Sequence, residues 1–241
     1  MFQLLNRDHH IISRGDELYP DTLVGALGSG APKRLHCLGN LDLFNGPGLG
    51  FCGSRKASPQ GLAVAQDCAA QAAEMDINVV SGNAAGVDFE AHYRALESGG
   101  RTILVLPEGI CNFRVRKALN SVWDWDRVLV VSQFEPEDTW QAFRAMARNK
   151  IIIGLSGAMI VIEAGERGGT LAAGRSAIDM GVPLFVARYE TVSEDAKGNE
   201  VLLDMGGTPL NRSKSTMRAN MSKVRNAIFD PAGFLEGRRL I

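Results

Sequence analysis

Long apolar runs are missing from this sequence, although 45% of its 241 residues are hydrophobic. No stretch approaches the roughly 20 consecutive apolar residues that a membrane-spanning helix requires. The first residues, 1–7, also lack the basic segment, apolar core and small-residue cleavage site of a secretory signal. We therefore expect a cytoplasmic protein with no membrane partner.

Paired metal ligands and clustered cysteines are missing as well. The four histidines are scattered apart from the neighbours His9 and His10, which we expect to be solvated, and no C-x-x-C pair occurs. This spacing predicts reduced thiols, no disulfide framework, no metal site and no bound cofactor. The cysteines are Cys37, Cys52, Cys68 and Cys111.

The sequence also lacks a strong excess of positive or negative charge. The chain has 26 Lys and Arg against 27 Asp and Glu, which gives a formal net charge of −1. This balance excludes a protein coated in positive charge. It leaves room for a local cationic groove, because phosphate binding depends on where the charges lie.

Strand and helix patterns alternate through the middle of the chain. The expected strands are continuous apolar runs, and the first expected helix opens with Ser58 as N-cap followed by Pro59. This alternation predicts an α/β fold of the extended Rossmann-like, doubly wound type, with a mainly parallel sheet and helices on both faces. We expect strands at 48–52, 77–80, 102–106, 127–131, 158–162 and 182–186, and helices at 58–74, 87–97, 113–120, 138–153 and 170–180.

Two regions flank this pattern. Residues 1–46 contain turn residues and are expected to form a lead-in that packs on the domain at 47–210. Residues 211–241 form a basic C-terminal extension with two open interpretations: a source of further phosphate contacts, or a solvated helix face. Its cations are Arg212, Lys214, Arg218, Lys223 and Arg225.

Three of the expected strand-to-helix junctions consist of small residues. They are 53–58, 81–86 and 165–170. Glycine lets a ligand approach the backbone, and the free N–H groups that open each following helix favour an anion. Because ligands bind at the carboxyl ends of parallel strands, we expect three helix starts to converge on a chain of phosphates. The first junction lacks the dinucleotide-binding motif G-x-G-x-x-G, so NAD is not indicated. The sequence also lacks the P-loop motif G-x-x-x-x-G-K-[ST], so ATP is not indicated.

At these junctions the sequence resembles the DNA-processing protein family (DprA/Smf). The resemblance extends from Tyr19-Pro20 to about Leu210 and consists of several ordered motifs. These motifs are Gly53-Ser54-Arg55 with Ser58 and Gly61, Ser81–Asp88 with Ala91-His92, Gly99–Ile103, Arg148–Ser156 and Glu163–Leu171. Many members carry an N-terminal helical module and a C-terminal winged helix, and we expect neither at full size in the 241 residues of this sequence.

The resemblance implies a protein, not an enzyme, that binds single-stranded DNA as a homodimer and loads a RecA-type recombinase during natural transformation. A divergent role in a mobile element or in phage defence also stays open. The resemblance assigns the strand-binding pocket to Gly53, Ser54, Arg55, Asn83, Arg148, Lys150, Gly168, Gly169 and Thr170. The junctions themselves add Lys56, Ser58, Ser81, Gly82 and Arg167 as phosphate-binding candidates.

Several side chains near the junctions have two interpretations. Asp88 opens a helix and is expected to cap it rather than to act in catalysis. Glu163 and Glu166 flank the third junction and, as a carboxylate pair, would suit an N-glycosidic hydrolase of nucleoside phosphates. A sensor for a nucleotide-derived ligand, or a scaffold without ligand, are further alternatives. Trp123 and Trp125 favour a core role over base stacking.

Overall fold

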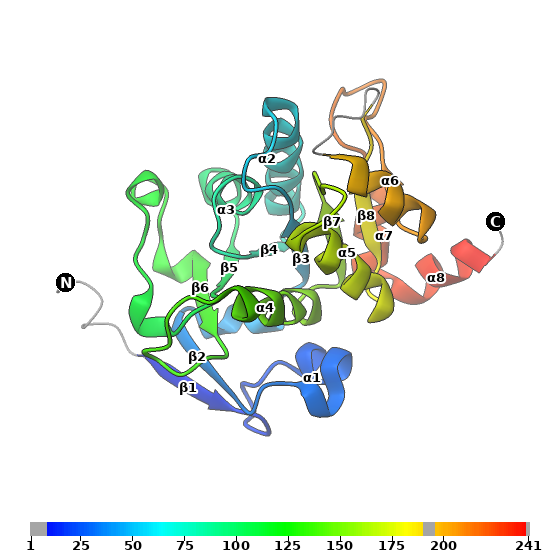
Figure 1. Ribbon diagram of the computed structural model, residues 1–241. Coiled ribbons are helices and arrows are strands. Elements are labelled where there is room, and N and C mark those ends of the chain that lie inside the picture. The colour runs from blue at the N-terminus through cyan, green and yellow to red at the C-terminus, as the bar shows by residue number, and fades with distance from the viewer. Residues whose placement is uncertain (1–8, 190–195, 240–241) are drawn as a thin grey trace.

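The sheet contains nine strands in the order β1-β2-β6-β5-β4-β3-β7-β8-β9 (Figure 1). The computed structural model describes the backbone of residues 9–189 and 196–239. β1 and β2 pair antiparallel with their neighbours, and the strands from β6 to β9 in this order are parallel. The strands are β1 His10–Ser13, β2 Arg34–Gly39, β3 Gly48–Cys52, β4 Asn78–Ser81, β5 Thr102–Val105, β6 Val128–Ser132, β7 Ala158–Val161, β8 Leu184–Ala187 and β9 Thr208–Leu210.

Helices cover both faces of this sheet (Figure 1). On one face α2 packs on α3, and on the other α1 packs on α4, α4 on α5 and α5 on α6. The helices are α1 Asp21–Leu27, α2 Pro59–Glu74, α3 Val87–Glu97, α4 Ala142–Gly154, α5 Gly169–Asp179, α6 Lys197–Asp204, α7 Ser222–Phe229 and α8 Pro231–Arg239. The predicted Rossmann-like α/β fold is confirmed.

Alternating side chains of the central strands divide the core into two layers. In β7, Met159 and Val161 pack with the layer of α1, α4, α5 and α6, and Ile160 packs with the layer of α2, α3 and α7. Both layers are apolar because the sheet is covered on both sides, which explains the continuous hydrophobic runs in the sequence. The sheet is therefore a rigid platform for the loops at its edge.

The predicted helix at 113–120 is wrong. This stretch contains only the short 3₁₀ turn Lys117–Leu119, preceded by another at Ile110–Asn112. Phe113 and Arg116 have extended backbone, with ψ of 138° and 137°. Burial of Phe113 in the side cluster of the core, together with burial of Leu119, overrides the weak helical pattern.

Helix α4 begins at Ala142, four residues later than the sequence predicted. The backbone of Gln141 is extended, and the carbonyl of Asp138 accepts a hydrogen bond from the N–H of Gly109 at 2.7 Å. Tertiary contacts of the preceding loop thus move the first residue of α4 to a later position in the chain than the sequence predicted.

Residues before β3 add β1 and β2 to the same sheet through antiparallel pairing with β6. Helix α1 covers them from the layer of α4. Within the described residues, every helix is too short or too polar to cross a lipid bilayer.

Candidate functional site

The chain order reverses between β3 and β7, which lie side by side in the sheet. From β3 the chain proceeds through β4, β5 and β6 in one direction, and it then returns to β7 on the other side of β3. Such a switch point leaves a crevice outside the carboxyl ends of the strands. A cavity of about 530 Å³ lies there.

Two of the three small-residue junctions and one face of α4 form most of the cavity wall. The second junction contributes Ala84. From α4 the residues Ala145, Arg148, Asn149 and Ile152 follow the spacing of a single helix face. The junction residues in the wall are Gly53, Ser54, Arg55, Gly165, Arg167, Gly169 and Thr170.

Arg148 is the buried cation of the cavity, with 7% of its surface exposed. Its Nη1 atom lies 3.2 Å from the carbonyl oxygen of Val105 and 3.9 Å from the Asp88 carboxylate. Its Nε atom has no hydrogen-bond partner among the described residues. A buried guanidinium with an unused donor, in the wall of a cavity, is suited to an anion.

Gly82 makes room for this guanidinium. A Cβ atom at position 82 would lie 1.5 Å from Nη1 of Arg148. The glycine of the second junction therefore serves the placement of Arg148, and Gly82 itself lines neither cavity described here.

Asp88 organises the second junction without capping α3 by its side chain. The carboxylate accepts a hydrogen bond from the N–H of Ala84 at 3.1 Å and lies 2.9 Å from the Ser81 hydroxyl. The N-cap of α3 is Gly86, which has no side-chain cap. The expectation that Asp88 caps α3 is therefore wrong, because its carboxylate contacts the second junction and Arg148 instead.

The start of α2 is already occupied by the protein's own carboxylate. The Ser58 hydroxyl accepts from the N–H of Gly61 at 3.0 Å and contacts Glu163 at 2.5 Å, and the Ser58 N–H donates to Glu163 at 2.8 Å. Glu163 is 2% exposed. The expectation that α2 offers its first amides to a ligand is therefore wrong, because Glu163 takes the place of an anion there.

The start of α3 is closed as well. The N–H of Val87 donates to the carbonyl of Ser54 at 3.3 Å. A Cβ atom on Gly86, whose φ is +74°, would lie 2.4 Å from the same carbonyl oxygen. Because α3 opens against the first junction, its first amide is not available to a phosphate.

Only α5, of the three helix starts considered, opens directly on the cavity. Gly169 and Thr170 of its first turn line the wall, and its N-cap Gly168 has no side-chain cap. Exposed Arg55 and Arg167 lie on the same wall, and neither has an ion-pair partner within the described ranges. The cavity thus combines one open helix start with three guanidinium groups, of which Arg148 is buried, and this combination suits an anion.

Buried Asn199 of α6 holds the third junction in place. Its side chain accepts from the N–H of Ala164 and donates to the carbonyls of Ile162 and Ala187, each at 2.8 Å. Sequence reasoning missed this residue, because a single asparagine in a polar segment carries no pattern that identifies its partners.

A second cavity of about 280 Å³ adjoins the first. Arg55, Ala84, Trp140 and Arg148 line both cavities. The second cavity is also lined by Asn83, Ala85, Pro107, Glu108 and Arg116. Of these, Glu108, Arg116 and Trp140 were not among the residues that the sequence singled out.

The predicted phosphate-binding residues divide into two groups. Those that line one or both cavities are Gly53, Ser54, Arg55, Asn83, Arg148, Arg167, Gly169 and Thr170. Those that line neither are Lys56, Ser58, Ser81, Gly82, Lys150 and Gly168. Lys150 is exposed although Arg148 is buried, because two residues along a helix point to different sides.

The aromatic side chains lie partly in the core and partly at the site. Trp123 and Trp125 pack edge to face on each other, with ring centroids 5.1 Å apart, beside buried Phe113. This supports the core interpretation. Trp140, which the sequence did not single out, is 49% exposed and lines both cavities, and Met146 of α4, which lines the first, is 46% exposed.

A hydrolytic role for the acidic pair finds no geometric support. Glu163 is bound to Ser58, and Glu166 is an exposed residue 3.9 Å from Lys197. Burial raises the pKa of the cavity thiol, Cys52, to about 12, which keeps it protonated and a poor nucleophile.

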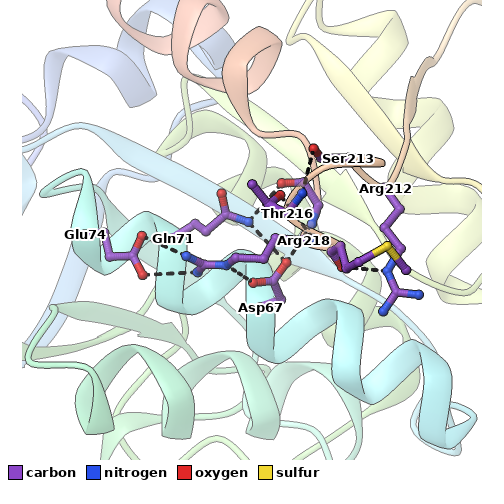
Figure 2. A network of polar contacts seen from close by, with 9 residues as sticks. Asp67, Gln71, Glu74, Arg212, Ser213, Thr216 and Arg218 are labelled. Atoms are coloured by element: carbon purple, nitrogen blue, oxygen red, sulfur yellow. Dashed lines mark hydrogen bonds and ion pairs between the residues drawn. The ribbon is translucent and has the colours of Figure 1, made fainter.

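Arg218 of the basic C-terminal extension is bound to α2 (Figure 2). Its guanidinium contacts Asp67 at 2.7 Å and Glu74 at 3.1 Å. The N–H of Ala219 also donates to Asp67, at 2.7 Å. This cation therefore attaches the extension to the domain and lies outside both cavities.

The fold and this cavity define an α/β protein with an arginine-lined crevice at the switch point of a parallel sheet. Residues 10–220 match the family model of the DNA recombination-mediator protein A, and the chain belongs to this family. The predicted family is confirmed.

Named proteins similar to this chain agree with the family assignment. The chain is 38% identical over 157 residues to DNA processing protein DprA of Streptococcus pneumoniae, covering 64% of this chain and 55% of that protein. It is 29% identical over 202 residues to protein Smf of Escherichia coli, covering 83% and 53%. The chain thus spans about half the length of the curated relatives that it matches.

Solved structures show the same fold. The X-ray structure of DNA processing protein A from Streptococcus pneumoniae has a TM-score of 0.75 and 32% identity, covering 84% of this chain and 71% of that chain. DNA processing protein A from Helicobacter pylori, described with a single-stranded DNA binding mode, has a TM-score of 0.68 and 24% identity, covering 85% and 91%.

Proposed function

We propose that the chain binds single-stranded DNA in the two adjoining cavities at the switch point. The observation that carries this proposal is the placement of Arg55, Arg148 and Arg167 around the open start of α5. A nucleic-acid backbone supplies a row of phosphates to such a site, and contacts of this kind position a strand with little reading of its sequence. The Helicobacter pylori relative, which is described as binding single-stranded DNA, supports the proposal.

Trp140 supplies a stacking surface for this strand. Its exposed indole lines both cavities, together with Arg55 and Arg148. Single-stranded nucleic acids are commonly bound by such a combination of cationic groove and aromatic face. The aromatic contact favours nucleic acid over an isolated phosphate or sulfate.

The wider role follows from the family. We infer a protein of DNA uptake and recombination that protects single strands, loads a RecA-type recombinase and works as a homodimer in the cytoplasm. This role involves binding rather than catalysis. Membership of the DNA recombination-mediator protein A family supports it.

Titration with ligands of different class separates the alternatives. Fluorescence anisotropy with labelled oligo-dT, and calorimetry with AMP, ADP-ribose and NAD, should show binding of the oligonucleotide alone. Release of free base from a nucleoside phosphate would instead support a hydrolase. Binding of mononucleotides in preference to oligo-dT would support a sensor.

Arg55→Ala should weaken oligo-dT binding about equally for all sequences, because its guanidinium lies on the cavity wall and has no ion-pair partner in the described residues. The slope of log K against log salt should flatten by about 0.7 for each lost phosphate contact. Arg175→Ala is the matched control, since Arg175 is exposed on α5 and lines neither cavity. Equal affinity and slope for both variants and the parent would place the strand elsewhere.

A further inference from the structure

Glu108 is the acidic side chain of the second cavity, where Arg55, Arg116 and Arg148 are the cations. It is partly buried, and this burial raises the pKa of its carboxyl group. Within the described ranges its carboxylate has no hydrogen bond and no ion pair, so none of the three arginines neutralises it. An unpaired carboxylate in a cationic cavity has its acceptor atoms free for a ligand.

The backbone around Glu108 is held firmly. Its carbonyl accepts a hydrogen bond from the hydroxyl of Ser132 at 2.7 Å, and the N–H of Gly109 donates to the carbonyl of Asp138 at 2.7 Å. A Cβ atom on Gly109 would lie 2.2 Å from the carbonyl of Glu135, which shows how closely the two loops pack. The carboxylate is therefore presented from a fixed position at the end of β5.

Charge distinguishes the two cavities. The first has the open start of α5 and Arg167, and both of its acids are bound: Glu163 to Ser58, and Asp88 to the Ser81 hydroxyl and the N–H of Ala84. The second has a free carboxylate, which repels a phosphate but accepts hydrogen bonds from N–H groups. A strand that crosses the shared residues Arg55 and Arg148 can thus place phosphate in the first cavity and a base in the second.

We propose that the second cavity holds one base of the bound strand and selects guanine through Glu108. This inference rests on the proposed binding of single-stranded DNA. Guanine presents two adjacent donors, N1–H and the 2-amino group, to the two oxygens of a carboxylate, and its O6 accepts from an amide or guanidinium such as that of Asn83 or Arg116. The indole of Trp140 offers a face for stacking.

The other bases match this arrangement less well. Thymine has a single N–H between two carbonyl acceptors, and those carbonyls face the carboxylate. Adenine and cytosine each place a ring acceptor beside their amino group, which a carboxylate also repels. Selection of guanine therefore follows from the number and order of donors on the base edge.

Oligo-dT strands of about 15 nucleotides, within the range that one binding domain covers, provide the test. One central position carries guanine, hypoxanthine or thymine, and anisotropy is measured at fixed salt. The parent should bind the guanine strand about tenfold more tightly than the all-thymine strand, as expected for one bidentate contact. Hypoxanthine, which lacks the 2-amino group, should be intermediate.

Glu108→Gln should abolish this preference, while its affinity for the all-thymine strand stays equal or rises because a negative charge is lost. Glu137→Gln is the matched control, since Glu137 is exposed in the following loop and lines neither cavity. The preference of the parent should also decline as the pH falls towards the raised pKa of Glu108.

The outcomes separate this inference from the proposed function. Equal affinity of the parent for guanine and thymine strands, or a preference that persists in Glu108→Gln, overturns the base site and leaves strand binding intact. Failure of the parent to bind any of the strands overturns both.

Discussion

Buried polar residues hold the second junction in the shape that accommodates Arg148. His92 of α3 is 1% exposed, and its ring nitrogens contact the hydroxyl of Thr102 at 2.6 Å and the carbonyl of Gly82 at 2.7 Å. Because Gly82 lies against the guanidinium, His92 is connected to the cavity through one residue. It is a positioning residue rather than a ligand contact.

Acid should destabilise the protein through His92. Burial lowers the pKa of His92 from 6.5 to about 4, so the unfolded chain binds a proton in this range and the folded chain does not. Stability is therefore full above pH 6.5 and is lost as the pH falls towards 4. Between pH 7 and pH 5 the loss should be about 2 kcal/mol in the free energy of unfolding.

Urea denaturation of the parent and of His92→Gln at both pH values measures this contribution. His9 and His36 also have pKa values lowered by burial, so the difference between the two proteins is the informative quantity. An acid-induced loss of the same size in the variant and in the parent would show that His92 is not the responsible group.

At the scale of elements, the cavity depends on how helices are fixed to strand ends. Helix α6 follows β8 in the chain but supports the loop after β7 through Asn199. Gly198 adds a second hydrogen bond to the same residue: its N–H donates to the carbonyl of Ala164 at 2.8 Å. Helix α6 therefore stabilises the start of the third junction, and the residues that follow in this junction line the cavity.

Asn199→Ala should lower the free energy of unfolding by about 3 kcal/mol, because it removes three buried hydrogen bonds: one from the N–H of Ala164 and one to each of the carbonyls of Ile162 and Ala187. It should also weaken oligo-dT binding by loosening the start of α5. Hydrogen exchange at the amide of Ala164 reports the local change directly.

Asn226→Ala, an exposed change on α7, serves as the control for Asn199→Ala. If the Ala164 amide keeps its protection in Asn199→Ala, then the Asn199 side chain is not what holds the junction, even if global stability falls.

At the scale of the whole molecule, contacts between distant parts of the chain attach the C-terminal extension to the domain. The segment after β9 returns to α2, where Arg218 contacts Asp67 and Glu74 and the side chain of Gln71 donates to the carbonyl of Ala219 at 2.9 Å (Figure 2). Arg212, by contrast, donates to the carbonyl of Met217 within its own loop at 2.6 Å. These contacts give the extension a structural role.

Arg218→Ala should lower the free energy of unfolding by about 1 kcal/mol, since its partners are partly exposed and such ion pairs contribute modestly. The salt dependence of oligo-dT binding should stay unchanged. Lys214→Ala, which removes the same charge from an exposed position of the same loop, should alter neither quantity. A flattened salt slope in Arg218→Ala would instead assign a phosphate contact to the extension.

The sequence determined the architecture because the pattern of strands and helices is local. Apolar runs, the Ser58-Pro59 helix start and small-residue junctions predicted a parallel sheet with its site at one edge, and the fold agrees. Helical spacing from Arg148 could also have identified Ala145, Asn149 and Ile152 as residues on the same face of α4. Trp140, in the loop before α4, had no such signal.

Only the tertiary structure decided which groups at that edge are free. Glu163 lies 105 residues from Ser58 in the chain, yet it closes the start of α2, and the carbonyl of Ser54 closes the start of α3. Satisfaction of a helix start depends on the partner that folding brings to it, which no local pattern records. For the same reason, only the tertiary structure shows that the Glu163 carboxylate is hydrogen-bonded to Ser58, whereas the Glu108 carboxylate faces the second cavity without a partner among the described residues.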